Sequence, residues 1–133
     1  MAVLLDTHVW AWWSLGDARL PSREREALDR GAARRELRLF AISLWEAQMA
    51  FAKGRLDLRD PFEAWLRAAA APDVIEIVPI DVPVALALNG LPATLPHDPA
   101  DRLIVAAARA YSLALATHDR AIRRSRAARL WRP

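Results

Sequence analysis

The sequence predicts an α/β layered fold with a central, mainly parallel sheet of four to five strands. Short apolar runs of strand length alternate with segments of helical length, which is typical of β–α–β units. Hydrophobic residues make up 54% of the 133 residues, enough to build a packed core. This length corresponds to about one domain, so residues 1–133 are expected to form a single domain.

The first elements are marked by an apolar run and by helix-end residues. Val3–Leu5 predicts a buried strand that leads into a helix, with Thr7 as the N-cap and an end near Gly16. Pro21–Arg30 predicts a charged helix, since proline is favoured in the first turn. Leu37–Ile42 predicts the second strand.

A capping-box pattern marks the next helix. Ser43 and Glu46 have the S-x-x-E spacing, in which each side chain satisfies a free backbone N–H group of the first turn. This helix is expected to end at Gly54. Asp60–Ala71 then predicts a helix, and Val74–Ile80 a third strand.

The remaining elements complete the alternation. Asp81–Leu88 predicts a short helix, and Pro99–Ala108 is the clearest helix in the chain. Leu113–Ala116 predicts a strand, and Asp119 begins a short helix. Arg129–Trp131 is expected to add a last edge strand.

Composition excludes several classes of protein. There is no cysteine, so disulfides and thiolate metal sites are excluded. The first residues carry no basic segment and meet an acid at Asp6, so no signal peptide is expected. No apolar run is long enough to span a bilayer, so we expect no membrane association and a cytoplasmic location.

The cations are unevenly distributed. The net charge is only +3, but 18 of the 19 cations are arginine, and six of them fall within the last fourteen residues. These six are Arg120, Arg123, Arg124, Arg126, Arg129 and Arg132. Such a run fits either a phosphate-binding patch or an ordinary solvated face, so charge alone does not decide the partner.

Four acids lie just after predicted strands or near the starts of predicted helices, at positions that a parallel sheet would bring to one edge. Asp6 follows the first strand, Glu46 lies one turn into the helix after the second, Asp101 is in the first turn after Pro99, and Asp119 follows the last strand. Ligands of open α/β sheets bind beyond the carboxyl ends of the strands. Individually, each acid also fits a helix-capping or first-turn role.

Together, the four acids indicate a cation site. Two carboxylates 4 Å apart repel by about 4 kcal/mol at an effective dielectric of 20. A hard divalent cation offsets that repulsion, and an all-oxygen ligand set suits Mg²⁺ or Mn²⁺. His8, His97 and His118 adjoin the acids and fit an outer or surface role better than general acid–base catalysis.

Five blocks of sequence carry a family resemblance. They are Leu4–Trp10, Ser43–Glu46, Lys53–Leu56, His97–Ile104 and Leu115–Asp119. In this order and spacing, over nearly the whole chain, they resemble PIN-domain toxins of the VapC family. The resemblance implies a three-layer α/β/α fold over residues 1–133, endoribonuclease activity that requires Mg²⁺ or Mn²⁺, and a cognate VapB-like antitoxin. A homodimer is a further expectation from the family.

The resemblance also implies roles for individual residues. Asp6, Glu46, Asp101 and Asp119 match the family's acidic quartet and are expected to be catalytic metal ligands. A bound metal would activate water for in-line attack on single-stranded regions of RNA. One departure is the shorter spacing between His97 and the Asp-Pro pair, which leaves the role of His97 open.

Supporting roles are expected around the quartet. Thr7, Ser43, Asp98 and Thr117 are placed to orient ligands or metal-bound waters, with helix capping as the alternative. Arg102, Arg123 and Arg124 are candidate phosphate contacts, and a salt bridge is the alternative for Arg102. Trp12 is expected to point away from the face of Trp10 and Trp13, where it would anchor a partner helix or simply be exposed.

Two rival functions remain on sequence grounds. A phosphoaspartyl enzyme with Asp6 as nucleophile needs a second acid two residues on and a nearby lysine, but position 8 is histidine and Lys53 is the only lysine. The other rival is a catalytically inactive PIN-like module that binds RNA or acts through its antitoxin. The complete acidic quartet argues against that loss of activity.

Overall fold

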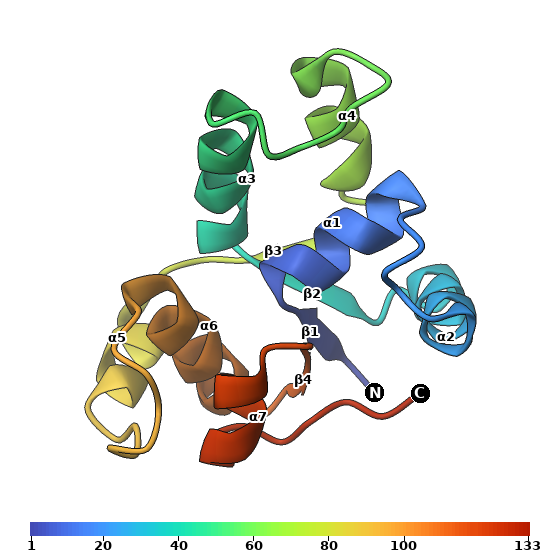
Figure 1. Cartoon of the computed structure of the whole chain (residues 1–133). Helices are drawn as coiled ribbons and strands as arrows, with labels where there is room; N and C mark the ends of the chain where they lie inside the picture. Colours follow the sequence, from blue (N-terminus) through green and yellow to red (C-terminus); the bar gives the residue numbers. More distant parts are fainter.

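The computed structural model describes residues 1–133, which form four strands and seven helices. The strands are β1 (Val3–Leu5), β2 (Leu37–Phe40), β3 (Glu76–Val78) and β4 (Ala114–Ala116). They pair in parallel in the order β3-β2-β1-β4 (Figure 1). The predicted α/β class and the parallel sheet are confirmed.

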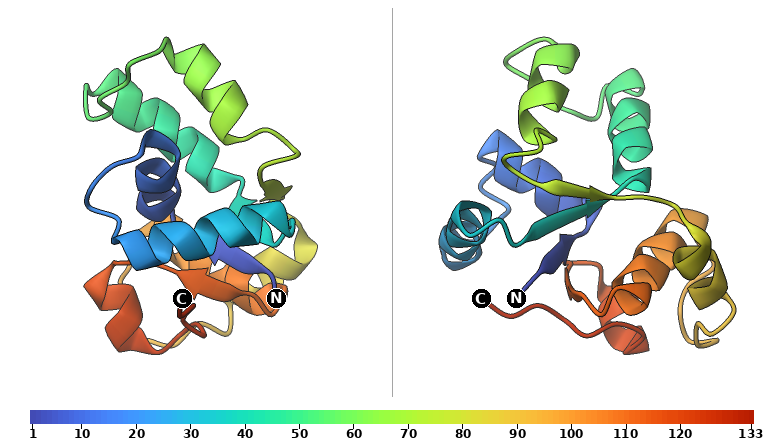
Figure 2. Two further views of the ribbon diagram at one scale, coloured as in Figure 1. Left: turned by 90° about the vertical axis from the view of Figure 1, so that its right-hand side faces the viewer. Right: turned by 180° about the vertical axis from the view of Figure 1, so that it is seen from behind.

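The helices cover both faces of this sheet. They are α1 (Thr7–Leu15), α2 (Ser22–Ala33), α3 (Ile42–Ala52), α4 (Phe62–Ala69), α5 (Val82–Leu88), α6 (Pro99–Ala110) and α7 (Arg120–Ser125). Figure 2 shows α1–α4 on one side of the strands and α5–α7 on the other. The three-layer arrangement implied by the resemblance is therefore confirmed. No helix combines the length and the apolar character that a bilayer crossing requires.

Alternate side chains of the strands build a core on each side of the sheet. Leu4 packs with Ile104 and Val105 of α6, whereas Val3 and Leu5 pack in the other cluster, with α1, α2 and α4. This follows from the two-residue period of a strand. Because both faces are covered, β1 and β4 are apolar throughout, whereas β2 and β3 each carry one charged residue, Arg38 and Glu76.

The strand register fixes where the chain leaves the sheet. Leu5, the last residue of β1, lies opposite Leu39 of β2 and Ala116 of β4. The segments that follow these three strands therefore emerge at the same edge. They lead into α1, α3 and α7, so the N-termini of three helices gather at the carboxyl end of the sheet.

Several predicted boundaries are wrong by a few residues. The strand expected over Leu37–Ile42 ends at Phe40 because α3 already begins at Ile42, and the strand expected over Val74–Ile80 is only Glu76–Val78. The expected edge strand Arg129–Trp131 is reduced to one parallel bridge between Leu115 and Leu130.

Two predicted helix caps are also wrong. Asp6, not Thr7, caps α1, because its Oδ1 accepts a hydrogen bond from the backbone N–H of Thr7 at 2.8 Å. The capping box in α3 does not form. Ala41 is the N-cap and has no side-chain hydrogen bond, while the side chains of Ser43 and Glu46 bond to Thr7 instead.

Candidate active site

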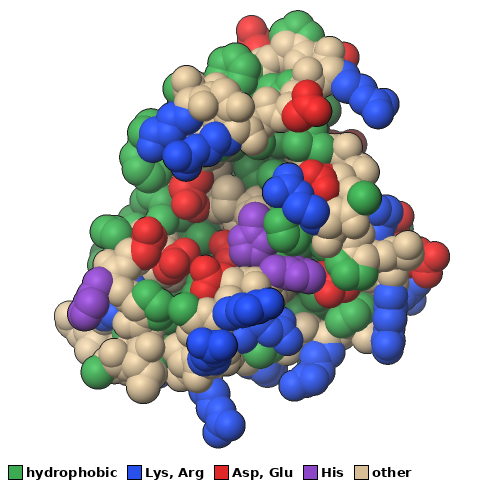
Figure 3. Space-filling view, viewed as in Figure 1, with side chains coloured by type: hydrophobic (Ala, Val, Ile, Leu, Met, Phe, Trp, Pro, Cys, Tyr) green, Lys and Arg blue, Asp and Glu red, His purple; other side chains and the backbone are tan.

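A cleft of about 740 Å³ opens at the carboxyl end of the sheet. All four acids of the predicted quartet line it, together with Asp98. Figure 3 shows acidic side chains gathered on this face, with Lys and Arg side chains to either side. The four acids lie at or near the N-terminal ends of α1, α3, α6 and α7, which meet at this hollow.

Asp6 is the most firmly held of these acids. Its side chain is buried, with 4% of the residue exposed. Oδ1 accepts from the backbone N–H of Thr7, and Oδ2 accepts from the hydroxyl of Thr117 at 2.6 Å. Nδ1 of His8 lies 3.6 Å from the same Oδ2. Asp6 is therefore both a helix cap and a carboxylate facing the cleft.

Thr7 links α1 to α3. Its hydroxyl donates to Oε1 of Glu46 at 2.5 Å and lies 2.7 Å from Oγ of the buried Ser43. Because Thr7 has a single hydroxyl proton and gives it to Glu46, Ser43 is the donor to Thr7. This chain of hydroxyls orients Glu46 toward the cleft, so Thr7 and Ser43 both support the quartet.

Asp98 and Asp119 have capping roles beside the cleft. Oδ1 of Asp98 accepts from the backbone N–H of Asp101 at 3.0 Å, which begins α6. Oδ1 of Asp119 accepts from the backbone N–H of Ile122 at 2.9 Å, which begins α7. Thr117 accepts from the backbone N–H of Asp119 at 3.0 Å, so its hydroxyl contacts two members of the quartet.

The acids perturb one another electrostatically. Partial burial, followed by the charges of Asp98, Asp6, Asp119 and Glu46, raises the pKa of Asp101 to about 7. Burial also raises the pKa of Glu46, with smaller contributions from Asp6 and Asp98 and an opposing one from the Thr7 hydroxyl. Ionising all of these groups together is therefore unfavourable unless a positive charge joins them.

The donor set fits a hard divalent cation. Carboxylate and hydroxyl oxygens line the centre of the cleft, and such ligands suit Mg²⁺ or Mn²⁺ rather than zinc. No three acidic or histidine side chains are gathered closely enough to enclose an ion as they stand.

One histidine, His8, lines the cleft and is linked to a second, His118. Nε2 of His8 accepts from the backbone N–H of His118 at 2.9 Å, and Nε2 of His118 lies 2.7 Å from Oε2 of Glu24 on α2. Burial lowers the pKa of His8 despite the neighbouring Asp6. Both rings are thus engaged in holding the loop before Asp119. His97, in contrast, is exposed.

The candidate phosphate contacts differ in their surroundings. Arg123 donates to the backbone carbonyl of Thr117 at 2.9 Å and so holds the β4–α7 loop. Arg124 is exposed, and Arg102 forms no ion pair, so the salt bridge considered for Arg102 is absent. None of the three lines the cleft itself.

Several residues that line the cleft were not predicted from the sequence. Arg19 lies on the α1–α2 connection, Trp45 on α3, and Lys53, Arg55 and Arg59 on and after the end of α3. The three cations within seven positions after α3 were the available signal. The sequence did not predict that these three cations face the cleft. The α3–α4 connection that carries them has no regular structure, so no periodic pattern indicates where its side chains point.

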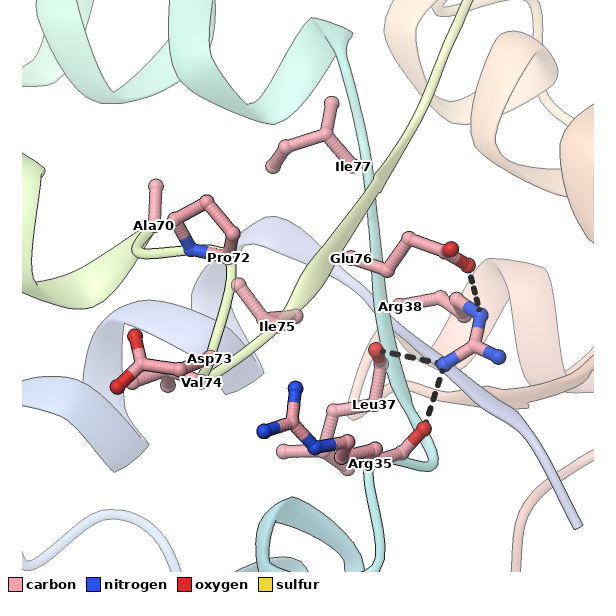
Figure 4. Close-up of a pocket in the computed structure, with 10 residues that line it drawn as sticks. All are labelled: Arg35, Leu37, Arg38, Ala70, Pro72, Asp73, Val74, Ile75, Glu76 and Ile77. Carbon is pink, nitrogen blue, oxygen red and sulfur yellow. Dashed lines mark hydrogen bonds and ion pairs between the residues drawn. The ribbon is translucent and has the colours of Figure 1, made fainter.

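A second cavity of about 400 Å³ lies at the other end of the sheet, beside the start of β2 and β3 (Figure 4). Its central cation, Arg38, is bound by Glu76 and by the backbone carbonyls of Arg35 and Leu37. The guanidinium is therefore occupied by the protein's own groups, and this cavity lacks the carboxylate cluster of the cleft.

Comparisons with known proteins agree with this architecture. The family model of the PIN domain matches residues 3–127. Ribonuclease VapC22 of Mycobacterium tuberculosis (strain ATCC 25618 / H37Rv) is 37% identical over 124 residues, which cover 93% of this chain and 92% of that protein.

Two solved structures share the fold at low sequence identity. The crystal structure of VapBC2 from Rickettsia felis bound to a DNA fragment from their promoter has a TM-score of 0.77, with 18% identity and 98% of both chains covered. FitAcB from Neisseria gonorrhoeae has a TM-score of 0.68, with 23% identity, over 98% of this chain and 96% of that one. These two likenesses show the shared fold. The family model and the VapC22 match establish that the chain belongs to the PIN-domain family, as its resemblance to VapC proteins predicts.

Proposed function

We propose that this protein is a Mg²⁺- or Mn²⁺-dependent endoribonuclease that acts as the toxin of a toxin–antitoxin pair. The observation that carries the proposal is the convergence of Asp6, Glu46, Asp101 and Asp119 on one cleft at the carboxyl end of the sheet. The 37% identity to a protein named a ribonuclease supports the same class of substrate. The whole chain, residues 1–133, would act as one PIN domain.

The proposed chemistry is metal-assisted hydrolysis. A bound divalent cation would supply a water of lowered pKa and stabilise the leaving oxygen in an in-line attack on the phosphodiester. Asp6 and Asp101 would hold the cation, and Asp119 and Glu46 would complete the ligand set directly or through water. No side chain need act as a nucleophile.

The remaining residues would keep the ligands in place. Thr117 holds Oδ2 of Asp6 and the backbone of Asp119, while Thr7 holds Glu46. Asp98 fixes the first turn of α6 and so the position of Asp101. Such outer partners of metal ligands typically matter by 10- to 100-fold in affinity or activity.

The proposed partners are RNA, a VapB-like antitoxin and a second copy of this chain. The likeness to VapBC2 supports the antitoxin. Exposed apolar side chains on α3, including Trp45 and Phe51, offer a surface beside the cleft on which a partner segment can pack. Cations around the acids suit a phosphate backbone, so single-stranded RNA would lie across the cleft.

The test is cleavage of RNA by the purified protein with Mg²⁺, with Mn²⁺ and with EDTA. We expect cleavage only with metal, and a loss of at least about 100-fold in rate for Asp6→Asn and Asp101→Asn. Asp73→Asn, which removes an exposed carboxylate beside the second cavity, should keep the wild-type rate. Full activity in EDTA would rule out the metal mechanism.

The alternative is a catalytically inactive module that binds RNA or acts only through its antitoxin. It predicts binding without cleavage under every metal condition, and equal behaviour of wild type and Asp101→Asn. The complete set of cleft acids favours the enzyme, because clustered carboxylates repel one another and an inactive module gains nothing from keeping all four.

A further inference from the structure

An aromatic cluster adjoins Asp6 and Asp119 at the cleft. The ring of Trp12 lies 5.0 Å from that of His8 and 5.4 Å from that of His118, measured between centroids. The guanidinium carbon of Arg19 lies 5.1 Å from the centroid of the Trp12 ring. A planar aromatic surface with a cation over it is thus assembled from α1 and the two loops beside it.

This cluster adjoins the carboxylates directly. His8 follows Asp6 by two residues and lies 3.6 Å from its Oδ2, and His118 immediately precedes Asp119. Trp12, His8 and Arg19 line the cleft together with the acids. In Figure 3, a pair of histidine side chains adjoins the acidic group. A nucleotide whose phosphate lies at the carboxylates can therefore bring its base to this cluster.

The members of the cluster are held in place before any ligand arrives. His8 accepts from the backbone of His118, and His118 bonds Glu24. Arg19 donates hydrogen bonds to both carboxylate oxygens of Asp17, the shortest being 2.7 Å. A preorganised surface loses little conformational entropy when a ligand binds. The pairing with Asp17 also keeps the Arg19 guanidinium near the Trp12 ring, while 67% of the Arg19 side chain stays exposed to an incoming ligand.

We propose that Trp12 is a base-stacking residue, which binds the nucleobase of a nucleotide next to the phosphate that the carboxylates address. This inference rests on the proposed ribonuclease function and adds a base-binding position to it. Stacking on an aromatic ring serves every base, because each has a π face. The cation over the ring favours a nucleotide over an apolar peptide side chain, since Arg19 can also meet a phosphate.

The experiment measures how strongly binding depends on a base, with and without Trp12. Asp101→Asn protein, in Mg²⁺, would be titrated with a fluorescently labelled oligoadenylate and with a series in which one abasic ribose is moved along the chain. At one position, base removal should weaken binding by about 5- to 150-fold, the range of one base stacked on an aromatic ring. In Trp12→Leu, the same removal should change the affinity by less than about twofold.

Two further variants keep the result interpretable. Trp12→Phe retains a ring and should keep most of the base dependence, which also answers the case in which Trp12→Leu does not fold. Trp45→Leu removes an exposed indole from the same cleft and should leave the base dependence unchanged. The proposal would be overturned if removing the base weakened binding equally with Trp12 intact, in Trp12→Leu and in Trp12→Phe. It would also be overturned if the dependence of affinity on the base were lost only in Trp45→Leu.

The outcomes separate this inference from the proposed function. If the wild type cleaves RNA with Mg²⁺ but base dependence does not involve Trp12, only the stacking role fails. If the wild type neither cleaves nor binds RNA, the ribonuclease function fails and the stacking role fails with it.

Discussion

The hydroxyl of Thr117 donates to Oδ2 of Asp6 over 2.6 Å, although 111 residues separate the two in sequence. Both residues are buried, at 3% and 4% exposure. The bond joins the ends of the neighbouring parallel strands β1 and β4, where the chain turns toward the cleft. Asp6 is thereby fixed by one backbone and one side-chain donor, so its orientation depends on Thr117.

Thr117→Val should therefore lower both stability and activity. Valine keeps the shape but removes the hydrogen bond to the Asp6 carboxylate, which costs about 1.5–3 kcal/mol of unfolding free energy, and the acceptor for the backbone N–H of Asp119. The rate of RNA cleavage should fall by at least about 10-fold, as for other outer partners of metal ligands. Urea unfolding and single-turnover cleavage measure the two effects. Thr117→Ser restores the hydroxyl and should restore most of both; a Val variant at the wild-type rate would show that Thr117 only supports the loop.

Much of the fold follows from the sequence because local signals agree with the tertiary structure. The apolar strands β1 and β4 and the proline-opened helix α6 are all found near their predicted positions. The convergence of Asp6 and Asp119 follows from the rule that parallel strands end at one edge. The strands, the helix α6 and the shared location of Asp6 and Asp119 can thus be inferred from the sequence without any contact information.

The errors arise where a distant residue competes with a local partner. Ser43 and Glu46 have capping-box spacing, yet both bond Thr7, which lies 36 and 39 residues away. Local spacing says nothing about such a partner. Similarly, the contacts of Trp12 with His118 depend on how α1 packs against the β4–α7 loop, which the periodicity of either segment does not reveal.

Two arginines after Asp119 should differ in their effect on RNA binding and cleavage: Arg124 should act only through its charge, and Arg123 also by holding the protein backbone. Arg124 is exposed, so Arg124→Ala should remove at most one phosphate contact and reduce the slope of log affinity against log salt by about 0.7 for single-stranded RNA. Arg123 holds the carbonyl of Thr117, so Arg123→Ala should also lower the cleavage rate. Fluorescence anisotropy across a salt series gives the slopes. Arg34→Ala, at the far end of α2, is the control and should change neither; an unchanged slope in Arg124→Ala would make that residue part of a solvated face.

The metal-free protein should lose stability as the pH rises from about 4 to about 7. Burial and neighbouring carboxylates raise the pKa of Asp101 from 3.8 to about 7, so folding favours its protonated form. That contribution is complete below the unfolded pKa and disappears as the pH passes the folded one. Thermal melting in EDTA across this range tests it. Asp101→Asn should flatten the profile, Asp73→Asn should not, and a wild-type profile that rises over the same range would contradict the assigned cause.

Metal binding should reverse the penalty that clustered carboxylates impose. A cation that binds the folded cleft and hardly the unfolded chain stabilises by about 2.7 kcal/mol at a hundred times its dissociation constant. For a domain of this size, the melting temperature should rise by roughly 5–12 °C with Mg²⁺. Asp101→Asn removes one of the mutually repelling charges and one proposed ligand. In EDTA it should therefore melt above the wild type, yet gain much less from Mg²⁺.

These two effects must occur together for Asp101 to be a metal ligand. Loss of a favourable charge from the first turn of α6 would instead lower the melting temperature both with and without metal. Asp98→Asn separates the contributions, because it removes a neighbouring charge but also weakens the cap that bonds the N–H of Asp101. It should keep most of the Mg²⁺ shift. If Asp101→Asn melts below the wild type in EDTA and keeps the full Mg²⁺ shift, Asp101 serves the helix and not the cation.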